Sequence, residues 1–115
     1  MAGKYNATKT YVDDIKFDSA SEASRYAQLL LKKEKGLIDN LVLQQKYLIH
    51  INGIYICKYI ADFTYIDCET GKIVCEDVKN KHLAKTPLFS LKRKLVKAVH
   101  GFDIKIVDSK DVLGS

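Results

Sequence analysis

The middle of the chain contains three β-like segments separated by two strong turn signals. The segments are 41–51 (LVLQQKYLIHI), 54–67 (IYICKYIADFTYID) and 72–79 (KIVCEDVK), and Ile, Val and Tyr, which favour strands, recur in them. Asn52-Gly53 is the best short hairpin turn in the sequence, and the tetrapeptide CETG makes the second turn. These signals predict three consecutive antiparallel strands, so the fold must be built on a meander.

One helical pattern precedes the meander and another follows it. Ser19 is a good N-cap for the first helix, with Glu22 three residues later, and Gly36 is a natural stop. Pro87 suits the first turn of the second helix, which Gly101 closes. Both segments carry apolar residues at helical spacing. We therefore expect two helices that pack on the sheet.

The remaining segments complete a single α/β domain with a mixed sheet flanked by the two helices. Residues 102–107 predict a last strand, and the connection from 72–79 through the second helix is long enough for a parallel crossover. A short strand is expected within 11–17. Residues 1–10 are expected to form a flexible basic arm, and 108–115 a tail. A chain of 115 residues has the usual size of one domain.

The composition argues against a membrane span and against a zinc site. No apolar run in the sequence reaches the ~18 residues that a transmembrane helix requires. The first residues lack the apolar stretch of a secretory signal, so a cytoplasmic protein is expected. Cys57, Cys68 and Cys75 contain no CxxC pair, and zinc-ligand spacing is absent. We expect three free thiols.

The whole chain has a net charge of +5, and one stretch in its second half carries positive charge without any acidic residue. Between Val78 and Phe102 there is no acidic residue. The basic residues of this stretch are Lys79, Lys81, Lys85, Lys92, Arg93, Lys94 and Lys97. Segregated positive charge suggests a polyanionic partner, and the alternative is a solvated basic face.

Two carboxylates interrupt the apolar strands of the meander. If the second turn comprises residues 68–71, Asp67 pairs with Lys72, and counting back sets Asp62 directly opposite Asp77 on one face. A three-residue loop or a bulge would shift this register. A buried carboxylate is costly without compensation, so two facing ones suggest a cation or a substrate between them.

Lys79 shares the face of Asp77, whereas Glu76 has the opposite parity and should point away. Paired carboxylates suit a hard divalent cation such as Mg²⁺, and an adjacent ammonium can orient a water molecule. The alternative reading is a strand-edge acid at Asp62 and a surface ion pair between Asp77 and Lys79. Glu76 and Asp77 are adjacent acids, and Glu76 remains the second choice of the two for binding metal.

Two further side chains have both a structural and a functional interpretation. Glu22 completes a capping box with Ser19, but it also lies beside the apolar face of its helix and could reach the rim of the sheet. Lys92 falls inside the apolar stripe of the second helix. Its side chain either snorkels to solvent or directs its ammonium at a phosphate where the helix crosses the sheet.

Together these residues resemble the PD-(D/E)XK nuclease superfamily, and more specifically a phage-encoded family of unknown function within it. The resemblance covers nearly the whole chain: YIADFTY and VCEDVKN look like the catalytic hairpin, and SLKRKLV is similar to the basic helix. Ala61 stands where the motif's name has Pro. The resemblance implies a restriction-endonuclease-like αβββαβ core of the kind found in Holliday-junction resolvases.

The resemblance also implies roles by position. Asp62 stands where the first acid of the motif binds metal, Asp77 stands at the second acid, and Lys79 at the lysine. Glu22 matches the additional acid that many members carry on the first helix. Gln44 matches a polar residue near the site. The implied activity is a metal-dependent DNA endonuclease that hydrolyses phosphodiester bonds with Mg²⁺ or Mn²⁺.

In this interpretation Lys79 helps to position the attacking water, and the metal stabilises negative charge on the phosphate. DNA phosphates beside the site are expected to contact Lys81, Lys85, Lys92, Arg93 and Lys94. Analogy with phage resolvases extends the expectation to branched DNA, to a homodimer, and to the cytoplasm of a bacterial host.

The competing interpretation is a nucleic-acid-binding module without catalysis. A double-stranded-RNA-binding domain also runs α-β-β-β-α with a basic start to its second helix, but facing acids in its sheet would work against phosphate binding. A degenerate nuclease fold that only binds DNA is the other form of this alternative.

Overall fold

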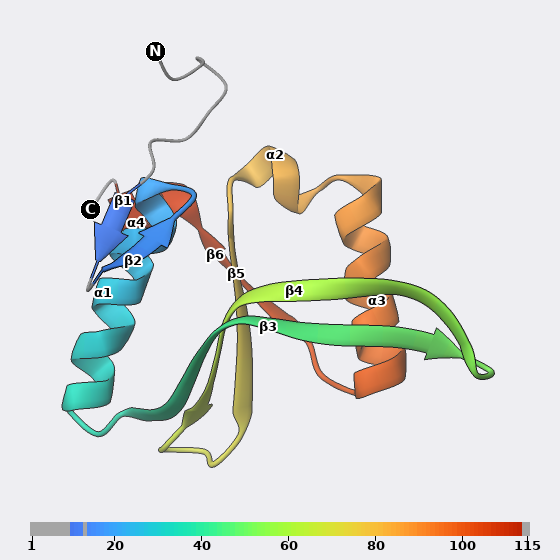
Figure 1. The fold of residues 1–115 in the computed structure, drawn as a ribbon, viewed down its shortest axis with the longest axis horizontal. Helices are drawn as coiled ribbons and strands as arrows, with labels where there is room; N and C mark the ends of the chain where they lie inside the picture. Colours follow the sequence, from blue (N-terminus) through green and yellow to red (C-terminus); the bar gives the residue numbers. More distant parts are fainter. Residues whose placement is uncertain (1–9, 13, 114–115) are drawn as a thin grey trace.

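The core of the molecule is a four-stranded mixed sheet with the strand order β3-β4-β5-β6. In the computed structural model, which describes residues 10–12 and 14–113, these strands are β3 (Ile38–Ile51), β4 (Ile54–Asp67), β5 (Ile73–Lys79) and β6 (Ile104–Asp108). The first three are antiparallel, and β6 lies parallel to β5 (Figure 1). The predicted meander and the predicted parallel crossover are both confirmed.

Two long helices flank the sheet, one at each end in the view of Figure 1. They are α1 (Ala20–Glu34) and α3 (Pro87–His100). The Ser19 side chain accepts a hydrogen bond from the amide of Glu22, and Gly101 ends α3 with a φ of 83°. That φ lies in the left-handed region, which glycine adopts without steric cost. The predicted helix ends are confirmed.

Three short regions of the chain differ from the sequence-based prediction. The single strand expected within 11–17 is an antiparallel hairpin of β1 (Thr10–Val12) and β2 (Ile15–Phe17). A short helix, α2 (Lys81–Ala84), precedes α3. The expected tail contains the end of β6 and the helix α4 (Ser109–Leu113), which packs against α1. The predicted basic arm, apart from its last residue, lies outside the described residues.

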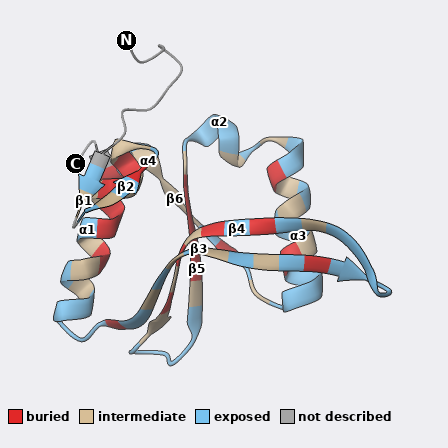
Figure 2. Ribbon diagram, viewed as in Figure 1, coloured by how far each residue is buried: buried red, intermediate tan, exposed pale blue. Residues whose placement is uncertain are grey.

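The buried side chains form two clusters (Figure 2). The α1 cluster contains Phe17, Ala23, Tyr26, Leu29, Ile38, Phe63, Tyr65 and Val78. The α3 cluster contains Ile49, Tyr59, Ala61, Cys75, Phe89, Val96 and Ile104. Because β5 contributes Val78 to one cluster and Cys75 to the other, the two helices cover opposite faces of this strand. The sheet is therefore the middle layer of the molecule.

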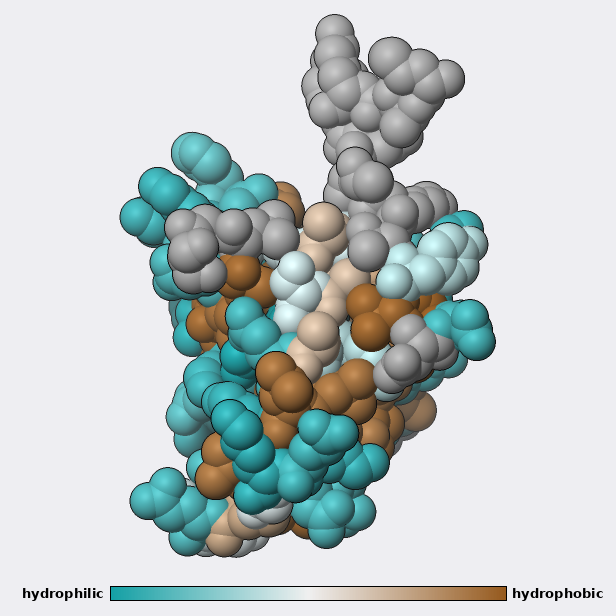
Figure 3. Space-filling model, turned by 90° about the vertical axis from the view of Figure 1, so that its left-hand side faces the viewer, coloured by the Kyte–Doolittle hydropathy of each residue, from teal (hydrophilic) through white to brown (hydrophobic). Residues whose placement is uncertain are grey.

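Polar and apolar side chains alternate on the face of the molecule drawn in Figure 3. Figure 3 looks onto the side of the molecule that faces left in Figure 1, and hydrophilic residues cover much of its lower half with apolar residues among them. No helix within the described residues is long and apolar enough to cross a membrane. The three cysteines are free thiols, and burial raises the pKa of Cys75 to about 12.

Candidate active site

The register of the β4–β5 hairpin brings the two predicted carboxylates together. Phe63 pairs with Glu76, and the amide of Asp67 donates a 2.9 Å hydrogen bond to the carbonyl of Lys72. The same register, carried one pair beyond Phe63, sets Asp62 opposite Asp77. The four-residue turn assumed from the sequence is therefore confirmed, and no bulge shifts this pairing in the ladder.

A change of face in β4 at Asp62 was not predicted. Tyr59 and Ala61 belong to the α3 cluster, whereas Phe63 and Tyr65 belong to the α1 cluster. Side chains two residues apart in a regular strand lie on the same face, so all four would share one layer in an undistorted strand. The chain must therefore twist across the sheet between Ala61 and Phe63, and Asp62 is the residue at this point.

The partner strand is distorted at the same level. Leu43 pairs with Phe63 and Gln45 pairs with Ala61, so Gln44 lies opposite Asp62. Gln44 has a φ of 55°, a left-handed conformation that is uncommon for residues other than glycine. Gln44 is exposed. The prediction that Gln44 contributes to a site stays a prediction, and the structure adds that its backbone is distorted at the level of Asp62.

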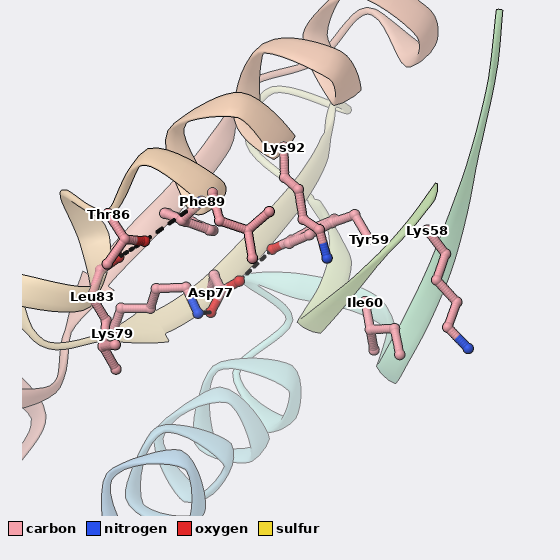
Figure 4. Close-up of a pocket in the computed structure, with 10 residues that line it drawn as sticks. Lys58, Tyr59, Ile60, Asp77, Lys79, Leu83, Thr86, Phe89 and Lys92 are labelled. Carbon is pink, nitrogen blue, oxygen red and sulfur yellow. Dashed lines mark hydrogen bonds and ion pairs between the residues drawn. The ribbon is translucent and has the colours of Figure 1, made fainter. Parts of the chain in front are cut away.

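Asp77 is buried, with 4% of its surface exposed, and both of its carboxylate oxygens have partners. The ammonium of Lys79 lies 3.2 Å from Oδ1, and the phenol of Tyr59 donates a 2.6 Å hydrogen bond to Oδ2 (Figure 4). Lys79 also lies 4.6 Å from the centre of the Phe89 ring, within the range of a cation–π contact. Asp77 is therefore held as a fixed, charge-balanced carboxylate.

Sequence reasoning missed Tyr59. In the sequence it is one tyrosine of an apolar β-like run, and such a residue is usually part of a core. Only the hydrogen bond to Asp77 distinguishes it. Burial and the negative charge of Asp77 raise the pKa of the Tyr59 phenol well above its ordinary value of 10.0, so the group stays protonated and remains a donor.

Asp62 is less well compensated than Asp77. Its Oδ2 accepts a 2.8 Å hydrogen bond from the amide of Val78, and no other partner of its carboxylate is found within the described residues. Burial, the facing carboxylate of Asp77 and the more distant one of Glu22 raise the pKa of Asp62 to about 8. The pair therefore favours binding of one positive charge, either a proton or a metal cation.

Glu22 lies on α1 near this pair. Burial raises its pKa, and the carboxylates of Asp18 and Asp77 raise it further. Even so, no group of three or more His, Cys, Asp and Glu side chains able to hold a metal ion occurs in residues 10–12 and 14–113. The structure thus brings Asp62 and Asp77 together, with Glu22 close enough to influence them but outside a complete ligand cluster.

Glu76 lies on the opposite face of β5, as its parity predicts. Its side chain is fully buried and receives two hydrogen bonds from the Arg25 guanidinium, at 2.8 and 2.7 Å, and one from the Tyr65 phenol. Burial alone would raise the pKa of Glu76, but the bonds from Arg25 and Tyr65 outweigh it and lower the pKa. Glu76 is therefore occupied by an ion pair and unsuited to bind metal at the acid pair.

A cavity of about 360 Å³ opens beside Asp77 (Figure 4). Its lining residues are Lys58, Tyr59, Ile60, Asp77, Lys79, Leu83, Thr86, Leu88, Phe89 and Lys92. Lys92 is half-buried, and its side chain extends from α3 toward Tyr59. The interpretation of Lys92 as a residue directed at the site agrees with this placement.

The other basic residues predicted to contact nucleic acid do not line this cavity. Arg93 and Lys94 are exposed and line a second depression, together with Lys97 and Asp103. Lys81 and Lys85 are exposed on α2 and at its end. Of the basic residues between Val78 and Phe102, only Lys79 and Lys92 therefore share the cavity with Asp77, and Lys58 of β4 joins them there.

Comparison with known proteins gives a family but no function. A family model described as "Protein of unknown function (DUF1064)" matches residues 2–110. A search of curated proteins and a search of solved structures each find no match. The match spans nearly the whole length of the chain, from the first residues through β6. The chain therefore belongs to the DUF1064 family.

Proposed function

We propose that the protein is a metal-dependent DNA endonuclease with a PD-(D/E)XK site on a restriction-endonuclease-like core. The observation that carries the proposal is the pair of half-buried Asp62 and buried Asp77, in which Asp62 lacks a counter-charge and Lys79 stands beside Asp77. The element order α1, β3, β4, β5, α3, β6 supports it, because it agrees with the αβββαβ core of that superfamily. A purely structural sheet has no use for two facing acids.

The two acids supply oxygen donors of the kind that a hard divalent cation takes, and at Asp77 the cation would share these oxygens with Lys79 and Tyr59. Carboxylate oxygens are the ligands that Mg²⁺ and Mn²⁺ prefer, and the pKa of Asp62, raised by burial and by the carboxylates of Asp77 and Glu22, supports a place for a cation beside it. Asp62 and Asp77 would hold the ion, with Glu22 as a nearby third acid. A bound Mg²⁺ or Mn²⁺ would supply positive charge that stabilises the phosphate in hydrolysis.

The other roles belong to side chains of the chain itself. Tyr59 fixes Oδ2 of Asp77 by its hydrogen bond and so limits rotation of that carboxylate. Lys79 places an ammonium next to Asp77, where it can orient a water molecule for attack on phosphorus. Lys92 lines the same cavity and can contact a phosphate next to the scissile one.

The test is cleavage of linear, nicked, flapped and four-way DNA by the purified protein with Mg²⁺ or Mn²⁺. Asp62→Ala is expected to abolish cleavage and to retain DNA binding. The matched control is Glu69→Gln, which removes an exposed acid from the turn at the other end of the same hairpin, and it should cleave like the wild type. If the wild type cuts none of these substrates with either ion, the nuclease proposal fails and a DNA-binding role is left.

A further inference from the structure

The cavity beside Asp77 has apolar walls that a phosphate chain does not require. Leu83 and Leu88 are 52% and 65% exposed, and Ile60 is 37% exposed. Leu83 comes from α2 and Ile60 from β4, and Figure 4 shows them on opposite sides of Asp77. Phosphates are bound by cations and hydrogen-bond donors, so these side chains suit another, apolar part of a ligand.

The charged groups of the same cavity suit an anion. The lining includes three lysines, Lys58, Lys79 and Lys92. Among the lining residues that the structure describes, one, Asp77, is acidic. A ligand that matches both features carries a negative charge next to a flat apolar face. A nucleotide has this character, but in a continuous duplex the faces of its base are covered by stacking, and only an unstacked base can present them.

We propose that this cavity binds the base of an unpaired nucleotide adjacent to the phosphate held near Asp77. The substrate class is then DNA with a local unpaired nucleotide, as in a bulge or a flap, in preference to continuous duplex. Leu83, Leu88 and Ile60 contact the base, and Lys92 contacts its phosphate. The position of that phosphate rests on the proposed nuclease function, but the preference for an unpaired base is measured without cleavage.

The experiment measures binding by fluorescence anisotropy in EDTA, which removes divalent ions and prevents metal-dependent cleavage. Three DNA probes with the same number of base pairs are compared. They are a continuous duplex, the duplex with one extra unpaired thymidine, and the duplex with an abasic residue in place of that thymidine. The wild type is expected to bind the thymidine bulge about tenfold more tightly than the other two, the size of effect that burial of about 55 Å² of apolar surface supplies.

The double variant Leu83→Ala/Leu88→Ala is expected to lose most of this preference and to keep its affinity for continuous duplex. Both leucines are exposed, so their truncation leaves the two buried clusters intact. Leu31→Ala is the matched control, because Leu31 is similarly exposed at 57% but lies on α1, outside the cavity. This control should show the wild-type preference.

Equal affinity of the wild type for the three probes, equal binding of the thymidine and abasic bulges, or an unchanged preference in the double variant would overturn the inference. None of these results bears on the nuclease proposal, which is decided by metal-dependent cleavage and its loss in Asp62→Ala. A protein that cuts continuous duplex without preference would keep the nuclease proposal and exclude the base-binding cavity.

Discussion

The two acids of the site are equivalent in the sequence pattern but not in their surroundings. Asp77 has an ammonium on one oxygen and a phenol on the other, whereas Asp62 has one backbone amide. Burial and the facing carboxylate of Asp77 together raise the pKa of Asp62, the member of the pair with the weaker compensation. This asymmetry identifies Asp62 as the residue whose charge state should respond most to pH and to cations.

The pH dependence of stability in EDTA tests this asymmetry. The folded protein holds the proton of Asp62 up to a pKa of about 8, against an ordinary value of 3.8 in the unfolded chain. The folded state therefore binds more protons, and the contribution of Asp62 to stability is lost as the pH rises from about 4 to about 8. Urea unfolding should show Asp62→Asn gaining stability relative to the wild type across this range.

Divalent cations should reverse this trend in the wild type. At about pH 8, Mg²⁺ is expected to raise the midpoint of wild-type unfolding and to leave Asp62→Asn nearly unchanged, because a ligand stabilises the state that binds it. A pH-independent difference between the two proteins in EDTA would contradict the raised pKa of Asp62.

At the scale of elements, one ion pair joins α1 to the central strand β5. Arg25 binds both carboxylate oxygens of Glu76, which directly precedes Asp77 in β5. Arg25 also lies one helical turn after Glu22 on α1. The pair therefore links the helix that carries Glu22 to the strand that carries Asp77, so the placement of these two acids depends on it.

Removal of one partner from this buried pair should be strongly destabilising. Glu76→Gln leaves the Arg25 guanidinium without its carboxylate, and breaking a buried pair in this way costs about 3–5 kcal/mol of unfolding free energy. Urea unfolding measures the loss. Asp103→Asn, which breaks the exposed pair with Lys97, is the control and should cost about 1 kcal/mol or less. Similar costs for the two variants would show that the Arg25–Glu76 pair is not the link described.

At the scale of the whole molecule, the sequence predicts the sheet well because its turns are explicit. Asn52 and Gly53 have φ values of 53° and 79°, the left-handed pair that a tight hairpin requires, and the CETG turn fixed the register that aligns Asp62 with Asp77. Spacing alone predicts the α/β class with a mixed sheet, the two long helices and the face of β5 on which Glu76 lies. These features depend on local chemistry, which a single sequence records.

What the sequence did not reveal depends on contacts between distant segments. The twist of β4 at Asp62 leaves the alternation of residue types unchanged, so periodicity does not detect it. Tyr59 resembles a core tyrosine until its partner on β5 is known. The helices α2 and α4 are four and five residues long, too short for a clear periodic pattern. Long-range packing, and not propensity, determines all of these features.

In the proposed role, the distribution of basic residues over the surface predicts how the affinity for DNA depends on salt. Lys92 lines the cavity with Asp77, so its ammonium should release about one counterion when DNA binds. Lys92→Gln is expected to lower the slope of log affinity against log salt concentration by about 1. Lys33→Gln, at an exposed position on α1, should keep the wild-type slope. Anisotropy titrations at several salt concentrations measure both slopes, and equal slopes would remove Lys92 from the DNA contact.

The crossing of β4 from one buried cluster to the other has a consequence for folding. Residues before Asp62 pack in the α3 cluster and residues after it in the α1 cluster, so the surroundings of the acid pair depend on both halves of the molecule. A chain in which one of the two clusters has not formed would lack half of the packing that fixes the acid pair. In the proposed nuclease, such incomplete molecules should therefore bind a divalent ion more weakly than the complete fold.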